Sequence, residues 1–100
     1  ESADAAAAEI RALGRRAEAF TTDVSDYDQV QALVAGTVEK LGGIDVLVNN
    51  AGIAKGQPFL EITQENWKAH LEIHLYGTFY CSQAAARDMA KRIHVRTAVA

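Results

Sequence analysis

Residues 45–52 read DVLVNNAG, and this stretch decides how the whole chain is interpreted. Ile44 and Val46–Val48 form an apolar run broken only by Asp45, and two asparagines, an alanine and a glycine follow it. Such a run is typical of a strand buried inside a parallel sheet. In open α/β sheets, ligands bind beyond the carboxyl ends of the strands, so residues 49–52 are predicted to lie at a ligand-binding edge.

Helical and strand-like patterns alternate along the rest of the chain. Apolar residues recur at helical spacing, glycines close two of the helices, and Ser25 with Asp28 and Thr63 are the expected helix caps. The expected order is helix 2–13, strand 16–22, helix 27–41, strand 44–48, a long helix 66–90 and strand 92–100. This alternation predicts an open, parallel α/β sheet with right-handed crossovers.

Composition excludes several classes of protein. The chain has 100 residues, a net charge of −3 and 49% hydrophobic residues, which is ordinary for a globular domain and gives no basic footprint for nucleic acid or an anionic membrane. No apolar run approaches the roughly 20 residues of a membrane span. The single cysteine, Cys81, cannot form an internal disulfide, which favours a reducing, cytoplasmic location. We see no pattern of metal ligands and expect no metal.

Two strand ends carry the candidate binding residues. Small Ala51 and Gly52 permit close approach of a flat ligand to the backbone, and the side chain of Asn49 offers both a donor and an acceptor. The pair Asp23-Val24 ends the preceding predicted strand at the same edge. Each feature also has a purely structural explanation: an amide turn at the end of a strand, and a helix cap beside Ser25.

Taken together, these motifs bring a family into view. Asp23-Val24-Ser25, the DVLVNNAG stretch and a long helix containing Gly77-Thr78-Phe79 closely resemble the short-chain dehydrogenases/reductases, across nearly the whole chain. The resemblance implies a Rossmann-like, doubly wound parallel sheet, present here from its second helix to about its fifth strand. Residues 1–100 would then be a partial dinucleotide-binding domain and a segment of a longer chain.

The resemblance also assigns roles to single residues. It implies NAD or NADP as the cofactor, with Asp23 contacting the adenine amine and Val24 lining the adenine pocket. Asn49, Ala51 and Gly52 would lie along the ribose and nicotinamide side, and Asn50 would brace the sheet. The long helix at about 66–90 is similar to the one that pairs subunits in this family, so we expect a homodimer or homotetramer.

The chain departs from the family pattern at the catalytic positions. It contains neither the glycine-rich TGxxxGxG loop nor the tyrosine four residues before a lysine. His74 stands where the family has asparagine; it either holds a relay water or is simply a hydrogen-bonded core residue. Ala98 falls at the position of the catalytic serine, and Thr97 is a possible substitute only if the register slips by one residue.

The function implied for the parent protein is reversible hydride transfer between a nicotinamide and a carbonyl or secondary alcohol. The loop 56–63 resembles acetoin or polyol dehydrogenases, and the long helix equally suits 3-oxoacyl-carrier-protein reductases. The alternatives are a non-catalytic relative that binds the cofactor or serves as a scaffold, suggested by His74 and Ala98, or an inactive fragment.

Overall fold

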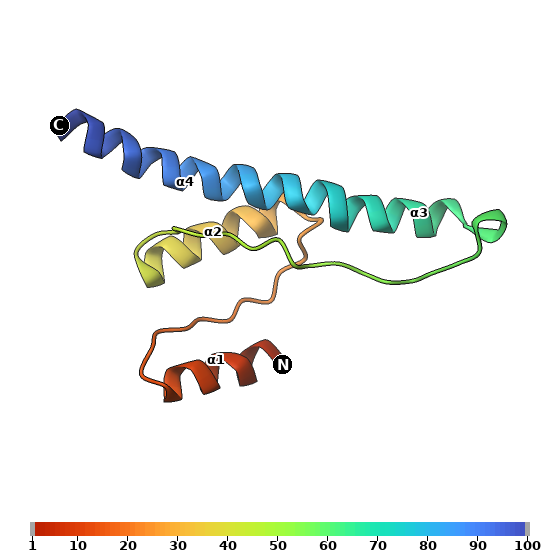
Figure 1. Cartoon of the computed structure of the whole chain (residues 1–100), viewed down its shortest axis with the longest axis horizontal. Coiled ribbons are helices and arrows are strands. Elements are labelled where there is room, and N and C mark those ends of the chain that lie inside the picture. The colour runs from red at the N-terminus through yellow and green to blue at the C-terminus, as the bar shows by residue number, and fades with distance from the viewer. Residues whose placement is uncertain (1, 100) are drawn as a thin grey trace.

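A computed structural model describes the backbone of residues 2–99 and the side chains of residues 2–92. Its described part is helical, with long connections that run between the helices (Figure 1). The elements are α1 (Ser2–Ala12), α2 (Tyr27–Leu41), the 3-10 turn η1 (Phe59–Glu61), α3 (Gln64–His70), the π-helical stretch η2 (Leu71–Tyr76) and α4 (Gly77–Val99).

One long helical rod dominates the molecule. α3, η2 and α4 follow one another without a break and cross the whole of Figure 1. The predicted cap Thr63 is confirmed, because its hydroxyl accepts a hydrogen bond from the backbone N–H of Asn66 at 3.0 Å. The helix begins at Gln64, two residues earlier than expected. The π-helical stretch lies in its middle, and such stretches frequently occur at functional sites.

The cap of α2 differs from the predicted one. Asp26, not Ser25, is the N-cap residue, and its carboxylate accepts from the backbone N–H of Gln29 at 3.1 Å. Ser25 instead bonds to Asp23, and this leaves the neighbouring aspartate to cap the helix. The predicted stop is confirmed at Gly42, which adopts a left-handed φ of 93° and donates to the carbonyl of Val38.

The predicted sheet is not formed. Residues 16–22 and 44–48 carry no strand assignment, and across residues 2–99 no strand is present. A strand needs the N–H and C=O groups of a neighbour. In the doubly wound order 3-2-1-4-5, strands three and four are not neighbours, so these two segments have no reason to pair with each other.

The predicted strand at 92–100 is also wrong over the residues that the structure describes. Here α4 continues to Val99, and Ala100 lies outside the described residues. A helix satisfies its backbone hydrogen bonds within its own segment, whereas a strand without a neighbour leaves them unpaired. The helical continuation is therefore the locally satisfied conformation.

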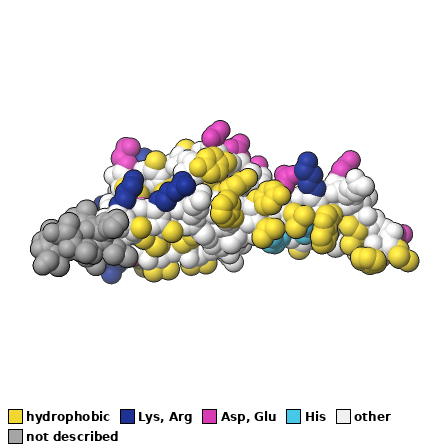
Figure 2. All heavy atoms as spheres, turned by 90° about the horizontal axis from the view of Figure 1, so that it is seen from above, with side chains coloured by type: hydrophobic (Ala, Val, Ile, Leu, Met, Phe, Trp, Pro, Cys, Tyr) yellow, Lys and Arg dark blue, Asp and Glu magenta, His cyan; other side chains and the backbone are white. Residues whose placement is uncertain are grey.

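The core is small and lies where α2 packs against α4. Val30 is fully buried beside Cys81 and Ala84, with Val24 and Tyr80 packed around them. Many large apolar side chains remain at the surface, and Figure 2 shows hydrophobic side chains along much of one face. The described part extends 57 × 36 × 19 Å, which is elongated for about 100 residues. No helix in the described part is long and apolar enough to cross a bilayer.

Candidate functional site

The NNAG segment lies beside the middle of the long helix. Nδ2 of Asn49 donates a hydrogen bond to Oγ of Ser82 in α4 at 3.1 Å. Residues 49–52 are all exposed. The small residues among them therefore leave an accessible strip of backbone at the point where the sequence predicts a ligand-binding edge.

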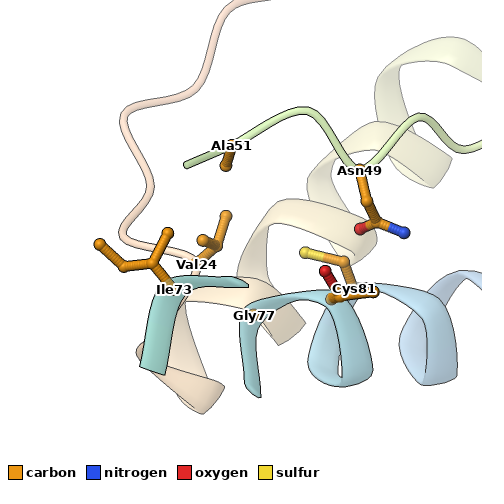
Figure 3. Close-up of a pocket in the computed structure, with 7 residues that line it drawn as sticks. Val24, Asn49, Ala51, Ile73, Gly77 and Cys81 are labelled. Atoms are coloured by element: carbon orange, nitrogen blue, oxygen red, sulfur yellow. The ribbon is translucent and has the colours of Figure 1, made fainter. Parts of the chain in front are cut away.

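A small pocket brings together three of the predicted cofactor-binding residues. Val24, Asn49 and Ala51 come from two connecting segments and face the long helix across this pocket (Figure 3). From the helix, its wall is completed by Ile73, Gly77, Thr78 and Cys81. The cavity volume is about 10 Å³, which is close to the space that one water molecule needs.

Gly77 permits the close approach of Val24 to the helix. A Cβ atom on Gly77 would lie 2.8 Å from Cγ2 of Val24 and 3.2 Å from its carbonyl oxygen. Any larger residue would push the 23–24 segment away from η2 and α4. The absence of a side chain at Gly77 thus permits the close contact between Val24 and the helix.

His74 contacts the backbone directly after the NNAG motif. Its Nε2 atom lies 3.1 Å from the N–H of Ile53 and 3.0 Å from the carbonyl oxygen of the same residue. The neutral ring either accepts from the N–H or donates to the carbonyl, depending on the nitrogen that carries the proton. A Cβ atom on Gly52 would overlap the His74 ring. The imidazole thus occupies the space that a side chain at residue 52 would need.

A second histidine supports the ring of His74. The rings of His70 and His74 stack with centroids 5.8 Å apart and planes inclined by 14°. Nδ1 of His70 lies 2.8 Å from the carbonyl oxygen of Asn66, one helical turn earlier, so Nδ1 donates a hydrogen bond to that oxygen. His74 is therefore hydrogen-bonded to the backbone of Ile53, but it is an exposed residue and not part of the core.

Asp23 is held by the turn that precedes α2. Its Oδ1 atom accepts from the hydroxyl of Ser25 at 2.6 Å and from the backbone N–H of Ser25 at 2.9 Å, while its own N–H donates to Oε1 of Gln29 at 2.8 Å. These two donors hold the pKa of the Asp23 carboxyl below its usual value. The carboxylate is therefore charged, exposed and fixed in orientation at one oxygen.

The two predicted catalytic residues are not brought together. His74 lies in η2, and Thr97 lies far along α4 on the same continuous rod. Twenty-three helical residues separate them, which corresponds to roughly 35 Å along the axis. The side chains of Thr97 and Ala98 lie outside the described residues.

Some contributors to the site were missed by sequence reasoning. Ser82, Gly77 and Thr78 meet the two connecting segments, and Thr78 donates to the carbonyl of His74 at 2.7 Å. Gly77 and Thr78 were quoted only for the family resemblance, and Ser82 carried no local signal in the sequence. Within the described residues no cluster of three or more histidine, cysteine, aspartate or glutamate side chains could hold a metal ion.

Comparison of the sequence with known proteins identifies its family. The model of the short chain dehydrogenase family matches residues 1–96. A 3-oxoacyl-[acyl-carrier-protein] reductase from Synechocystis is 41% identical over 91 residues, covering 91% of this chain and 37% of the relative. An L-rhamnose 1-dehydrogenase (NAD(P)(+)) from Sphingomonas is 39% identical over 98 residues, covering 98% of this chain and 39% of the relative.

Solved structures extend the similarity to the backbone. A short chain dehydrogenase from Burkholderia cenocepacia in complex with NADP superposes with a TM-score of 0.81 at 40% identity, covering 85% of this chain and 35% of that one. The chain belongs to the short-chain dehydrogenase family. It spans little more than a third of the length of the curated relatives that it matches.

Proposed function

We propose that the protein carrying these residues is an NAD(P)-dependent oxidoreductase. It would transfer a hydride reversibly between the nicotinamide and a carbonyl or secondary alcohol. The observation that carries this proposal is the convergence of Val24, Asn49 and Ala51 on one pocket beside the long helix. Membership of the family supports it, because relatives are named as reductases and dehydrogenases.

The residues present fit one wall of a dinucleotide site. The pocket itself is too small for a nicotinamide ring, but the strip 49–52 is exposed and has small side chains, so a flat ring can lie against it from outside. A bound cofactor supplies the hydride. Asn49, Ala51 and Gly52 would orient its ribose and nicotinamide half, Val24 would line the adenine pocket, and the Asp23 carboxylate would accept from the adenine amine.

The substrate is proposed only by class. One relative is named as a 3-oxoacyl-[acyl-carrier-protein] reductase, and others are named as dehydrogenases of sugars and sugar acids. We therefore propose a small-molecule carbonyl or alcohol substrate of the 3-oxoacyl or the polyol type.

The long helix supplies the proposed contact between subunits. Trp67, Leu75, Tyr76 and Phe79 are between 49% and 59% exposed although they are large and apolar. A second copy of the helix would cover such side chains, in agreement with a homodimer or homotetramer. We place the protein in the cytoplasm, since Cys81 is a free thiol buried in the core.

Expression of the complete gene provides the test. The purified protein should oxidise NADH or NADPH in the presence of acetoacetyl-CoA or butane-2,3-dione, and its sequence should contain a tyrosine four residues before a lysine. If a dinucleotide binds but neither carbonyl is reduced and the pair is absent, the alternative of a non-catalytic relative is correct. If neither dinucleotide binds, the proposal itself is wrong.

A further inference from the structure

A second cavity lies where the connection after NNAG turns back to begin α3 (Figure 1). Its volume is about 240 Å³. The side chains that line it are those of Lys55, Gln57, Ile62, Asn66, Trp67 and His70. All of them fall within residues 55–70, so one continuous stretch of the chain builds the cavity.

Two stacked histidines connect this cavity to the NNAG segment. His74 contacts the backbone of Ile53 and fills the space beside Gly52. The ring of His70, which lines the cavity, stacks on the ring of His74 with centroids 5.8 Å apart. The two histidines are four residues apart on one rod, which corresponds to roughly 6 Å along a helix axis. A substrate whose reacting carbon lies at the NNAG segment can therefore extend its non-reacting part into the cavity.

Hydrogen bonds within the stretch orient two polar side chains of the cavity. Oε1 of Gln57 accepts from the backbone N–H of Thr63 at 3.2 Å, which leaves the amide nitrogen of Gln57 as a donor. Nδ2 of Asn66 donates to the carbonyl oxygen of Lys55 at 3.0 Å, which leaves Oδ1 of Asn66 as an acceptor.

His70 and Lys55 add to this set of polar groups. Nδ1 of His70 donates to the carbonyl oxygen of Asn66 at 2.8 Å, so Nε2 of the neutral ring carries a lone pair and can accept. The ammonium group of Lys55 contributes further donors. The cavity thus combines donors and acceptors within a small space.

Trp67 and Ile62 give the same cavity an apolar side. An apolar wall with a few oriented polar groups is typical of small-molecule sites, which usually enclose roughly 300–1,000 Å³. A volume of about 240 Å³ suits one part of a substrate and not a whole substrate with its cofactor.

A hydroxylated carbon chain matches both sides of the cavity. Each hydroxyl group donates and accepts, and the C–H groups between the hydroxyls are apolar. A fatty acyl chain has no group that could pair with the polar side chains, and leaving such groups unpaired on binding is costly.

We propose that this cavity is a specificity subsite for a polyhydroxylated substrate, that is, a sugar or a polyol. Gln57, Asn66 and His70 bind its hydroxyl groups. This choice of substrate class rests on the oxidoreductase function proposed above. In the reaction, the carbinol carbon of the substrate gives a hydride to the oxidised nicotinamide and its hydroxyl gives a proton to solvent, so the substrate becomes a carbonyl compound.

Gln57 and His70 allow changes that remove one kind of hydrogen-bonding atom each. Gln57→Glu keeps the oxygen that accepts from Thr63 and removes the amide donor. His70→Asn keeps a donor near the position of Nδ1 but has no counterpart of Nε2, whereas the longer His70→Gln side chain reaches that position. Lys68→Gln is the matched control, because Lys68 lies on α3 outside the cavity and pairs with Glu72 at 3.8 Å.

The first measurement is kcat/KM of the complete protein with L-rhamnose, sorbitol and D-gluconate, and with butan-2-ol as an alcohol that has a single hydroxyl group. The wild-type protein should prefer at least one of the three hydroxylated substrates by about tenfold or more. Gln57→Glu and His70→Asn should each lower kcat/KM for that substrate by about three- to tenfold and leave butan-2-ol unchanged. His70→Gln should restore the wild-type value, and Lys68→Gln should alter neither substrate.

The second measurement does not depend on turnover. Amide hydrogen exchange of residues 55–70 is compared with and without each hydroxylated compound at saturation. We expect protection in the wild-type protein and weaker protection in His70→Asn.

Three results would overturn the proposal. They are reduction of acetoacetyl-CoA with a kcat/KM above that of every hydroxylated substrate, an equal loss on butan-2-ol in the two variants, and the absence of both preference and protection. If the protein binds neither NADH nor NADPH, the oxidoreductase proposal fails, while protection of residues 55–70 still decides whether the cavity binds a hydroxylated ligand.

Discussion

Val24 packs against Gly77 so closely that a methyl group on the glycine would overlap it. A Cβ atom at residue 77 would lie 2.8 Å from Cγ2 of Val24 and 3.2 Å from its carbonyl oxygen. The first atom is at the end of a side chain, which can rotate, but the second belongs to the backbone. This contact joins the segment after residue 22 to the helix that carries the rest of the candidate site.

Gly77→Ala should therefore destabilise the protein despite the better helix propensity of alanine. The propensity gain is about 1 kcal/mol, and the overlap with Val24 costs about 1–3 kcal/mol. We expect the free energy of unfolding to fall by up to about 2 kcal/mol, measured by urea denaturation.

Gly56→Ala is the matched control for this prediction, because a Cβ atom there has nothing within 4 Å and no left-handed φ. The double variant Gly77→Ala with Val24→Ala should lose part of the overlap and show a favourable coupling energy. A stabilised Gly77→Ala protein would show that the segment yields without cost and that the contact has no structural importance.

Gly52→Ala tests the contact between the NNAG segment and His74. The new methyl group would overlap the imidazole, so either the ring or the segment must move. We expect weaker dinucleotide binding by about tenfold, since a displaced ring also loses its hydrogen bond to Ile53. Fluorescence titration with NADH and NADPH provides the measurement.

The smaller His74→Asn side chain should relieve that overlap while retaining a donor and an acceptor. The double variant should therefore bind the dinucleotide more tightly than Gly52→Ala alone. If His74→Asn gives no relief, the loss in Gly52→Ala arises elsewhere, for example from contact with the cofactor itself.

Local signals in the sequence were sufficient to predict the helices. The caps at Thr63 and Gly42 follow from side-chain and backbone preferences within a few residues, and both are confirmed. The predictions of strands were wrong because strands depend on residues that are distant in the sequence. A strand such as 44–48 is defined by hydrogen bonds to a neighbouring strand, and apolar periodicity carries no information on whether that neighbour is present.

The sequence pointed to the candidate-site residues on the connecting segments, but not to those on the long helix. The motif identified Asn49 and Ala51 as residues at a common edge with Val24, and the structure places these three around one pocket. It gave no indication of Ser82, because a serine in a helix is ordinary until the segment opposite it is known. Pairing across 33 residues is a property of the tertiary structure and not of a local pattern.

Ser25→Ala should raise the pKa of the Asp23 carboxyl. The hydroxyl of Ser25 is the largest cause of its lowered value, and the backbone N–H of the same residue would remain as the second. A carboxyl whose pKa is lowered in the folded state stabilises that state above its unfolded pKa of about 3.9. This stabilisation is lost as the pH falls through the lower folded value.

The measurement is an NMR titration of the Asp23 side-chain carbon between pH 2 and pH 6. Ser25→Thr, which keeps the hydroxyl, is the control and should titrate like the wild-type protein. An unaltered midpoint in Ser25→Ala would mean that the hydroxyl does not hold the charge and that the backbone donor alone does so.

The thiol of Cys81 should react slowly with alkylating reagents. Its side chain is buried next to Val30, and burial raises its pKa above the usual value, which lowers the fraction of reactive thiolate. The pocket that it borders, at about 10 Å³, also excludes reagents larger than water. At pH 7.5 we expect labelling by iodoacetamide at least about tenfold slower than that of glutathione, with full labelling after denaturation in urea.

Because Cys81 lies where α2 meets α4, Val30→Ala should open this contact and accelerate labelling, whereas Val46→Ala, at an exposed position, should not. Labelling of the wild-type protein at the rate of glutathione would show that the two helices separate readily and that the small core does not hold the site together.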